Sequence, residues 1–142
     1  MKTILIVNAN YYKDISELLV KDAKKILKNK KIKAKIINVP GVFEIPIVLS
    51  KYINKFDGFI ALGCVIKGKT PHFDLICKSS FDAIMKLSIR NNKVIGNGII
   101  TALNMKQAKE RCSYNNSASK PNKGSEAAKA VISVLENELK SV

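Results

Sequence analysis

Residues 63–73, GCVIKGKTPHF, bring together a glycine turn, a lysine, a threonine hydroxyl and the only histidine of the chain. Gly68, Lys69 and Thr70 form a turn that leads into a helix predicted to begin near Pro71 and His72. Free backbone N–H groups and the positive dipole end of a helix favour an anion. An imidazole at the same turn can transfer protons near neutral pH. The segment therefore predicts anion binding beside acid–base chemistry, with an ordinary turn and an exposed histidine as the alternative.

The same segment matches G-x-x-x-x-G-K-[ST], the pattern of nucleotide-binding P-loops. In a P-loop the first glycine ends a strand, and the next four residues wrap around phosphate. Here apolar residues stand on both sides of Gly63, so the strand is predicted to continue through Ile66, and Pro71 delays the helix. No other predicted strand ends in an acidic residue that could hold magnesium. We interpret the match as chance and expect no ATP or GTP site.

Alternating strands and helices position these residues. Strands are predicted at residues 1–7, 32–39, within 56–66 and at 93–101, and the first of them is a continuous apolar run, typical of a strand buried on both faces. Amphipathic or capped segments predict helices around residues 15–27, from Pro46 onward, and around 73–87, 105–112 and 123–139. This alternation predicts one domain over residues 1–142, with a parallel sheet covered by helices on both faces. Ligands of such sheets bind beyond the carboxyl ends of the strands.

The formal net charge of +14 raises the question of a nucleic-acid partner. Only two of the 25 basic residues, Arg90 and Arg111, are arginines, whereas base recognition favours the arginine fork. Aromatic residues interleaved with the lysines, which single-strand binding favours, are missing as well. We therefore expect no nucleic-acid partner, and a basic nucleic-acid-binding module is the alternative from another functional class.

The remaining composition predicts a cytoplasmic protein without a membrane partner. No apolar run approaches the ~20 residues of a membrane span, and no cleavage site follows the short apolar run at the N-terminus. Cys64, Cys77 and Cys112 form no C-x-x-C pair, so free thiols are expected. A single histidine excludes a multi-histidine metal centre, and we expect no bound metal.

Four sequence blocks, in order, resemble the 6,7-dimethyl-8-ribityllumazine synthase family. VPGVFEIP is similar to the family's V-P-G-[AS]-[FW]-E-[IL]-P, and LGCVIKGKTPHFD to L-G-x-V-I-[RK]-G-x-T-x-H-[FY]-[DE]. QAKER and NKGSEAA resemble Q-A-x-x-R and N-K-G-x-E-A-A. The resemblance implies a flavodoxin-like three-layer α/β/α sandwich, for which we expect a four-stranded parallel sheet in the order 2-1-3-4. It also implies condensation of a ribitylamino-pyrimidinedione with dihydroxybutanone phosphate, without a metal or an organic cofactor.

The resemblance also implies roles for individual residues. His72 corresponds to the family's acid/base histidine, and Lys69, Thr70 and Arg111 to its phosphate-binding positions. A guanidinium binds phosphate with two parallel hydrogen bonds, which gives a physical reason for an arginine in a lysine-rich chain. The positions implied to hold the pyrimidine and its ribityl chain are Tyr11, Val42, Phe43, Glu44, Cys64, Val65, Ile66, Asn97 and Lys123.

Two positions depart from the family pattern. Where members commonly have A-R-F-N, this chain has ANYYKDI, so Tyr11 is chosen as the stacking aromatic residue and Tyr12 is the alternative. Asn97 stands where many members carry a phenylalanine. An archaeal-type riboflavin synthase, which shares the fold, is the nearest alternative activity. Substrate choice separates the two, because that enzyme dismutates two lumazines and needs no carbohydrate phosphate.

Family members form homopentamers whose sites are shared between adjacent chains, and some assemble twelve pentamers into a shell. The first predicted strand begins almost at the start of the sequence, without the extension that adds a strand to a neighbour's sheet. The segment between Arg111 and Lys123 is longer than the G-T-K-A-G link of shell-forming members. We therefore expect isolated pentamers, with Phe43, Glu44, His72 and Arg111 near the boundary between chains; the alternative is a loop that folds aside and permits shells.

Overall fold

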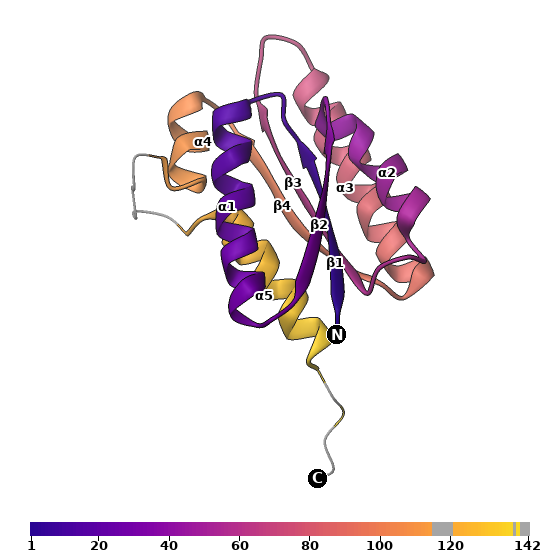
Figure 1. Cartoon of the computed structure of the whole chain (residues 1–142). Helices are drawn as coiled ribbons and strands as arrows, with labels where there is room; N and C mark the ends of the chain where they lie inside the picture. The colour runs from indigo at the N-terminus through magenta and orange to yellow at the C-terminus, as the bar shows by residue number, and fades with distance from the viewer. Residues whose placement is uncertain (115–120, 138, 140–142) are drawn as a thin grey trace.

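The computed structural model describes residues 1–114, 121–137 and 139. The polar loop predicted at residues 113–122 therefore falls largely outside the described residues. In chain order the elements (Figure 1) are β1 Thr3–Ala9, α1 Lys13–Asn29, β2 Lys33–Val39, the 3-10 turn η1 Val42–Glu44, α2 Ile45–Tyr52, β3 Gly58–Ile66, α3 His72–Asn91, β4 Val94–Ala102, α4 Met105–Arg111 and α5 Lys123–Leu135.

The four described strands form one parallel sheet in the order β2-β1-β3-β4, as predicted. The register aligns Thr3 with Lys33 and Ile4 with Gly58, so β1 pairs with a neighbour on each side. Because β1 and β3 are the central strands and are covered on both faces, nearly every residue in them is buried. This burial explains why both strands read as continuous apolar runs rather than as alternating patterns.

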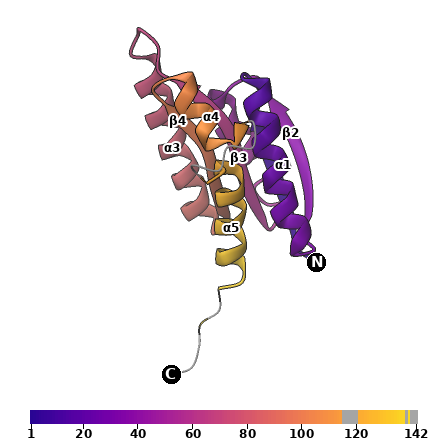
Figure 2. The same ribbon diagram turned by 90° about the vertical axis from the view of Figure 1, so that its left-hand side faces the viewer.

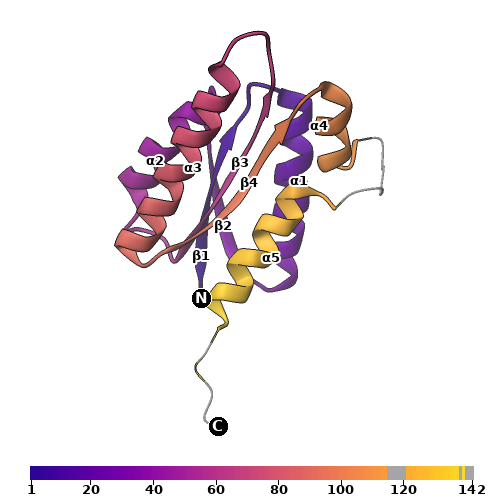
Figure 3. The same ribbon diagram turned by 180° about the vertical axis from the view of Figure 1, so that it is seen from behind.

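The helices form two layers, one on each face of the sheet. Figure 3 shows α2 and α3 on one face and α1, α4 and α5 on the other, and Figure 2 shows α1 and α5 from their own side. Alternate residues of β1 divide the core accordingly: Ile4 and Ile6 pack toward α1 and α5, and Leu5 and Val7 pack toward α2. The observed architecture is the expected three-layer sandwich.

Element boundaries differ from the sequence-based expectations at several ends. The first strand runs two residues further than predicted, to Ala9. The largest error concerns the last helix, which was predicted to reach residue 139 but ends at Leu135. Val134 is already 55% exposed and Leu139 is fully exposed, so the apolar pattern continues beyond the sheet that could bury it. The N–H of Asn137 bonds to the carbonyl of Val134, and this tighter turn closes the helix.

Candidate functional site

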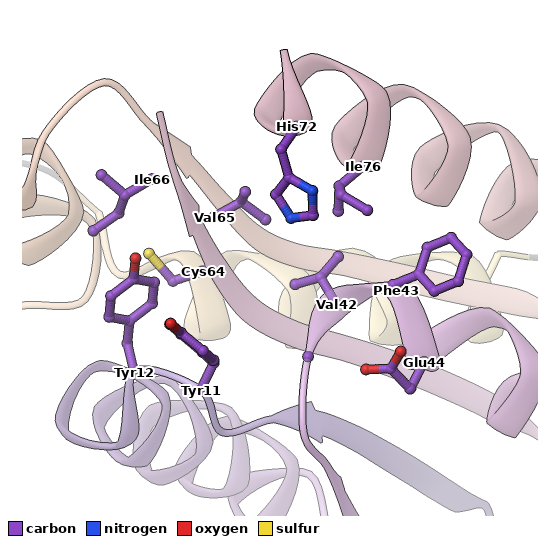
Figure 4. Close-up of a pocket in the computed structure, with 11 residues that line it drawn as sticks. Tyr11, Tyr12, Val42, Phe43, Glu44, Cys64, Val65, Ile66, His72 and Ile76 are labelled. Atoms are coloured by element: carbon purple, nitrogen blue, oxygen red, sulfur yellow. The ribbon is translucent and has the colours of Figure 1, made fainter. Parts of the chain in front are cut away.

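A cavity of about 600 Å³ opens at the carboxyl ends of β1 and β3. This size is within the range of small-molecule sites, and the position is the one expected for ligands of a parallel sheet. Its walls come from the β1–α1 loop, η1, the end of β3 and the first turns of α3 (Figure 4). The lining residues are Tyr11, Tyr12, Gly41, Val42, Phe43, Glu44, Cys64, Val65, Ile66, His72 and Ile76.

The structure brings eight of the predicted site residues together in this cavity. They come from three separate stretches of sequence and are Tyr11, Val42, Phe43, Glu44, Cys64, Val65, Ile66 and His72. The sequence interpretation did not select Gly41 and Ile76 and kept Tyr12 only as an alternative. Helical spacing offered a signal for Ile76, because it follows His72 by one turn of α3 and shares its face. Figure 4 shows both side chains on the same side of the cavity.

The end of β3 forms the inner wall. β3 runs without interruption through Gly63 to Ile66, which confirms that this stretch is a strand rather than a phosphate-binding loop. A β-carbon at Gly63 would lie 3.0 Å from Ala9 Cβ, so the glycine allows close packing. Burial raises the pKa of the Cys64 thiol to about 12, with a smaller contribution from the nearby Cys112. Cys64 is therefore protonated at neutral pH and forms part of the wall rather than a nucleophile.

η1 forms the opposite wall. Its first residue, Val42, is buried, whereas the Phe43 ring is 62% exposed at the edge of the cavity. A β-carbon on Gly41 would lie 3.1 Å from Glu44 Oε1. The missing side chain at Gly41 thus leaves room for the Glu44 carboxylate to lie against the turn. The glycine of the VPG motif was the sequence signal that could have identified Gly41 as part of the site. A carboxylate beside an exposed aromatic ring suits a polyhydroxylated ligand.

His72 begins α3 directly after Pro71, which occupies the N-cap position. The His72 backbone N–H donates a long hydrogen bond of 3.4 Å to Thr70 Oγ1, and both Lys69 and Thr70 are exposed. The turn therefore places the Thr70 hydroxyl at the N-terminus of a 20-residue helix, next to the backbone of His72. Neither Lys69 nor Thr70 is among the residues that line the cavity, so their binding of an anion stays a prediction.

Tyr11 and Tyr12 form an edge-to-face pair, with ring centroids 5.0 Å apart and ring planes at 79°. Tyr11 is 75% exposed at the cavity edge, whereas Tyr12 packs against the core. Burial raises the pKa of Tyr12, and the neighbouring Cys64 and Tyr11 raise it further. Tyr12 thus forms a fixed wall, and Tyr11 is the ring with open surface for stacking.

Arg111, Lys123 and Asn97 do not line the cavity. Arg111 is the exposed last residue of α4, and Lys123 is the first residue of α5. Asn97 lies opposite Ala61 in the middle of β4, and its Oδ1 accepts a hydrogen bond of 3.0 Å from the backbone N–H of Ile99. Among the described lining residues there is no lysine or arginine, so this chain's cavity lacks the guanidinium expected for phosphate.

A second, more apolar groove of about 570 Å³ lies between α2 and α3. Phe43 and Glu44 line both spaces, so the groove continues from the edge of the cavity. Ile47 in its wall is 68% exposed, so the groove presents apolar surface beside the cavity. Among the described residues, no helix has the length and apolar character needed to cross a bilayer, and no cluster of metal-ligating side chains is found.

The chain is similar to known proteins over most of its length. The family model described as 6,7-dimethyl-8-ribityllumazine synthase matches residues 1–138. A 6,7-dimethyl-8-ribityllumazine synthase of Bartonella tribocorum is 39% identical over 135 residues, which covers 93% of this chain and 87% of the relative. Proteins of the same name are 38% identical in Erythrobacter litoralis, covering 95% and 94%, and 37% identical in Methylorubrum populi, covering 93% and 80%.

Proposed function

The chain belongs to the 6,7-dimethyl-8-ribityllumazine synthase family, and we propose that its reaction takes place in the cavity at the carboxyl ends of β1 and β3. The enzyme is a transferase of riboflavin biosynthesis. It condenses 5-amino-6-(D-ribitylamino)uracil with 3,4-dihydroxy-2-butanone 4-phosphate, which gives 6,7-dimethyl-8-ribityllumazine, phosphate and water in the penultimate step. The observation that carries the placement is the convergence of eight predicted residues on this one cavity.

His72 is the proposed acid/base group. The reaction forms a Schiff base at the 5-amino group, loses phosphate and closes a second ring, so protons must move at several atoms. Among the described residues that line the cavity, His72 is the only histidine, the side-chain type that most often transfers protons in enzymes. Its position at the start of α3, beside the exposed Thr70, supports proton transfer next to the leaving phosphate.

The pyrimidine and its ribityl chain are proposed to lie between β3 and η1. Cys64, Val65 and Ile66 offer an apolar wall and the strand's end to the heterocycle. Val42, Phe43 and Glu44 are proposed to hold the ribityl chain, with the Glu44 carboxylate accepting hydrogen bonds from its hydroxyls. The exposed ring of Tyr11 supports its assignment as the stacking residue.

The phosphate is proposed to be bound by groups from two chains. Lys69 and Thr70 precede α3 in the chain that forms the cavity, whereas Arg111 comes from an adjacent copy. That copy also supplies Asn97 and Lys123, which are proposed to bind the pyrimidine and its ribityl chain. Two observations support this: the described lining residues include no arginine or lysine, and the apolar groove with Ile47 continues from the cavity edge. A phosphate dianion needs a cationic partner when water is excluded, so a second copy completes the site.

We propose a homopentamer as the assembly that provides these shared sites. The further expectation of isolated pentamers depends on the loop between Arg111 and Lys123, and residues 115–120 of this loop lie outside the described part of the chain. We also expect the enzyme to act in the cytoplasm on small molecules, with no cofactor and with neither nucleic acid nor membrane as a partner. The free thiols Cys64, Cys77 and Cys112 are compatible with a reducing compartment.

The direct test is to incubate the purified protein with both substrates and to follow the fluorescent lumazine and the released phosphate together. We expect the two products in equal amounts, and neither when one substrate is left out. A lack of product under conditions in which a characterised synthase is active would overturn the assignment.

A further inference from the structure

Arg111 and Lys123 are separated by a long polar segment in the sequence, yet the two helix ends that carry them are joined directly. The link is Asn122, whose side chain is buried, with 6% of the residue's surface exposed. Its Nδ2 group donates a hydrogen bond of 3.0 Å to the carbonyl oxygen of Cys112, the residue after Arg111. Its Oδ1 atom accepts hydrogen bonds of 2.8 Å from the N–H of Gly124 and 3.1 Å from that of Ser125.

One amide thereby satisfies backbone groups at the ends of two helices. The last carbonyls of α4 and the first N–H groups of α5 have no partners within their own helices. An asparagine at this position supplies a donor to the first helix and an acceptor to the second from two separate atoms, Nδ2 and Oδ1. An ionised carboxylate has no donor, and a hydroxyl has a single oxygen for both bonds. Because the amide is buried, water cannot replace a lost bond without cost.

Both sides of this link are themselves fixed by packing. Cys112 is fully buried beside Ala108 and contributes to the core on the α1 face. Gly124 lets the first turn of α5 lie directly against the backbone of Leu19 in α1, where a β-carbon would overlap. The position of α5 is therefore set by its packing on α1. The hydrogen bond from Asn122 to Cys112 then holds the end of α4 next to the start of α5.

We propose that Asn122 is a positioning residue of the synthase: by joining α4 to α5 it fixes the Arg111 guanidinium relative to Lys123, so that phosphate is held at a set distance from the pyrimidine. The inference rests on the proposed function, which assigns Arg111 to phosphate and Lys123 to the other substrate. Two reacting molecules held at a fixed separation react much faster than loosely bound ones. The hydrogen bond to Cys112, rather than the length of the loop, sets this separation.

The test compares Asn122→Asp with Asn104→Asp. Both residues are N-caps, since Asn104 Oδ1 accepts a hydrogen bond of 2.9 Å from the N–H of Gln107 at the start of α4. Aspartate retains the cap at either position. At position 122 it also loses the donor to Cys112 and sets a carboxylate against a carbonyl oxygen, whereas at the exposed position 104 no described residue forms such a bridge.

For Asn122→Asp we expect the KM for the butanone phosphate and the Kd for inorganic phosphate to rise about tenfold, as loss of a buried hydrogen bond allows. The Kd for the pyrimidine substrate should change by less than about twofold, because α5 stays on α1. Asn104→Asp should leave all three constants unchanged. Asn122→Ser, which retains the cap with a shorter side chain, should weaken phosphate binding in the same direction if the aspartate variant fails to fold.

Equal changes for both substrates, or a lower Tm with unchanged phosphate binding, would overturn the positioning role and leave Asn122 as a structural cap. Failure of the inference is distinct from failure of the proposed function. If Arg111→Lys weakens phosphate binding and Asn122→Asp does not, only the inference fails. If Arg111→Lys has no effect either, the assignment of Arg111 to phosphate is wrong.

Discussion

The cavity at the ends of β1 and β3 differs in construction from the corner formed by Arg111, Asn122 and Lys123, which we call the cationic corner. The cavity is recessed, and its lining is aromatic, aliphatic and acidic apart from His72. The cationic corner carries its charges at the ends of α4 and α5, across the sheet from α2 and α3 (Figure 3). In the proposed site, the cavity binds the heterocycle and the corner binds the phosphate. Neither region alone contains what a condensation with loss of phosphate requires.

The largest expected effect concerns the one general acid–base group of the cavity. We expect His72→Ala to lower kcat by about 10²–10⁴-fold, the usual contribution of such a group. The exposed His72 contributes little to the core, so the Tm should stay close to that of the wild type. Steady-state kinetics that follow the lumazine absorbance give kcat, and thermal unfolding gives the Tm. Activity within about threefold of wild type would remove His72 from the chemistry.

The cationic corner is tested by Arg111→Lys, which keeps the charge but loses the bidentate fork. We expect the affinity for inorganic phosphate to fall about tenfold, because one ammonium cannot form two parallel hydrogen bonds. Isothermal titration calorimetry gives the dissociation constant. Arg90→Lys, which changes the only other arginine, on the last turn of α3, is the matched control and should bind phosphate as the wild type does. Unchanged phosphate affinity in the Arg111 variant would mean that the cationic corner does not bind phosphate.

The aromatic edge of the cavity is tested by comparing Tyr11→Ala with Tyr12→Ala. Loss of a stacking ring should weaken binding of the pyrimidine substrate about three- to tenfold, as aromatic contacts of this kind contribute. Tyr11→Phe should bind as the wild type does, because the ring is retained. We expect Tyr12→Ala to lower the Tm more than Tyr11→Ala, since Tyr12 packs against the core. If only the Tyr12 variant loses affinity, the stacking residue is Tyr12.

The smallest effect concerns Cys64 and alkaline pH. Burial raises its pKa in the folded protein to about 12, above the ordinary value of 9.0, so folding favours the neutral thiol. This contribution to stability is fully present below about pH 9 and is lost as the pH rises toward 12. The free energy of unfolding, measured with urea, should therefore decline between pH 7 and pH 11. This decline should be less steep in Cys64→Ala than in the wild type. Equal slopes in the two proteins would mean that Cys64 does not contribute to the alkaline loss.

The sequence predicted the elements around the cavity better than the end of the last helix and the contact between α4 and α5. The apolar run predicted the strand that carries Cys64, Val65 and Ile66, and Pro71 predicted the helix start at His72. Their roles in the site came from the family resemblance. The alternation of strands and helices predicted a parallel sheet with its ligand beyond the carboxyl ends of the strands. The strand order was an expectation from the fold that the family resemblance implies. The end of α5 was missed, because Leu139 continues the helical pattern although nothing remains to cover it. The role of Asn122 was not predicted either, since its bond to Cys112 depends on how α4 meets α5.

In the proposed oligomer, the cavity of one chain works with the cationic corner of another. Mixing two inactive variants, His72→Ala and Arg111→Ala, by co-expression or by dissociation and reassembly tests it directly. In an equal mixture, a cavity with an intact His72 faces an intact Arg111 at about a quarter of the boundaries between chains, given random assembly of symmetric oligomers. We therefore predict recovery of lumazine synthesis to about a quarter of the wild-type rate, far above either variant alone. Mixed oligomers with no more activity than the separate variants would contradict a site shared between chains.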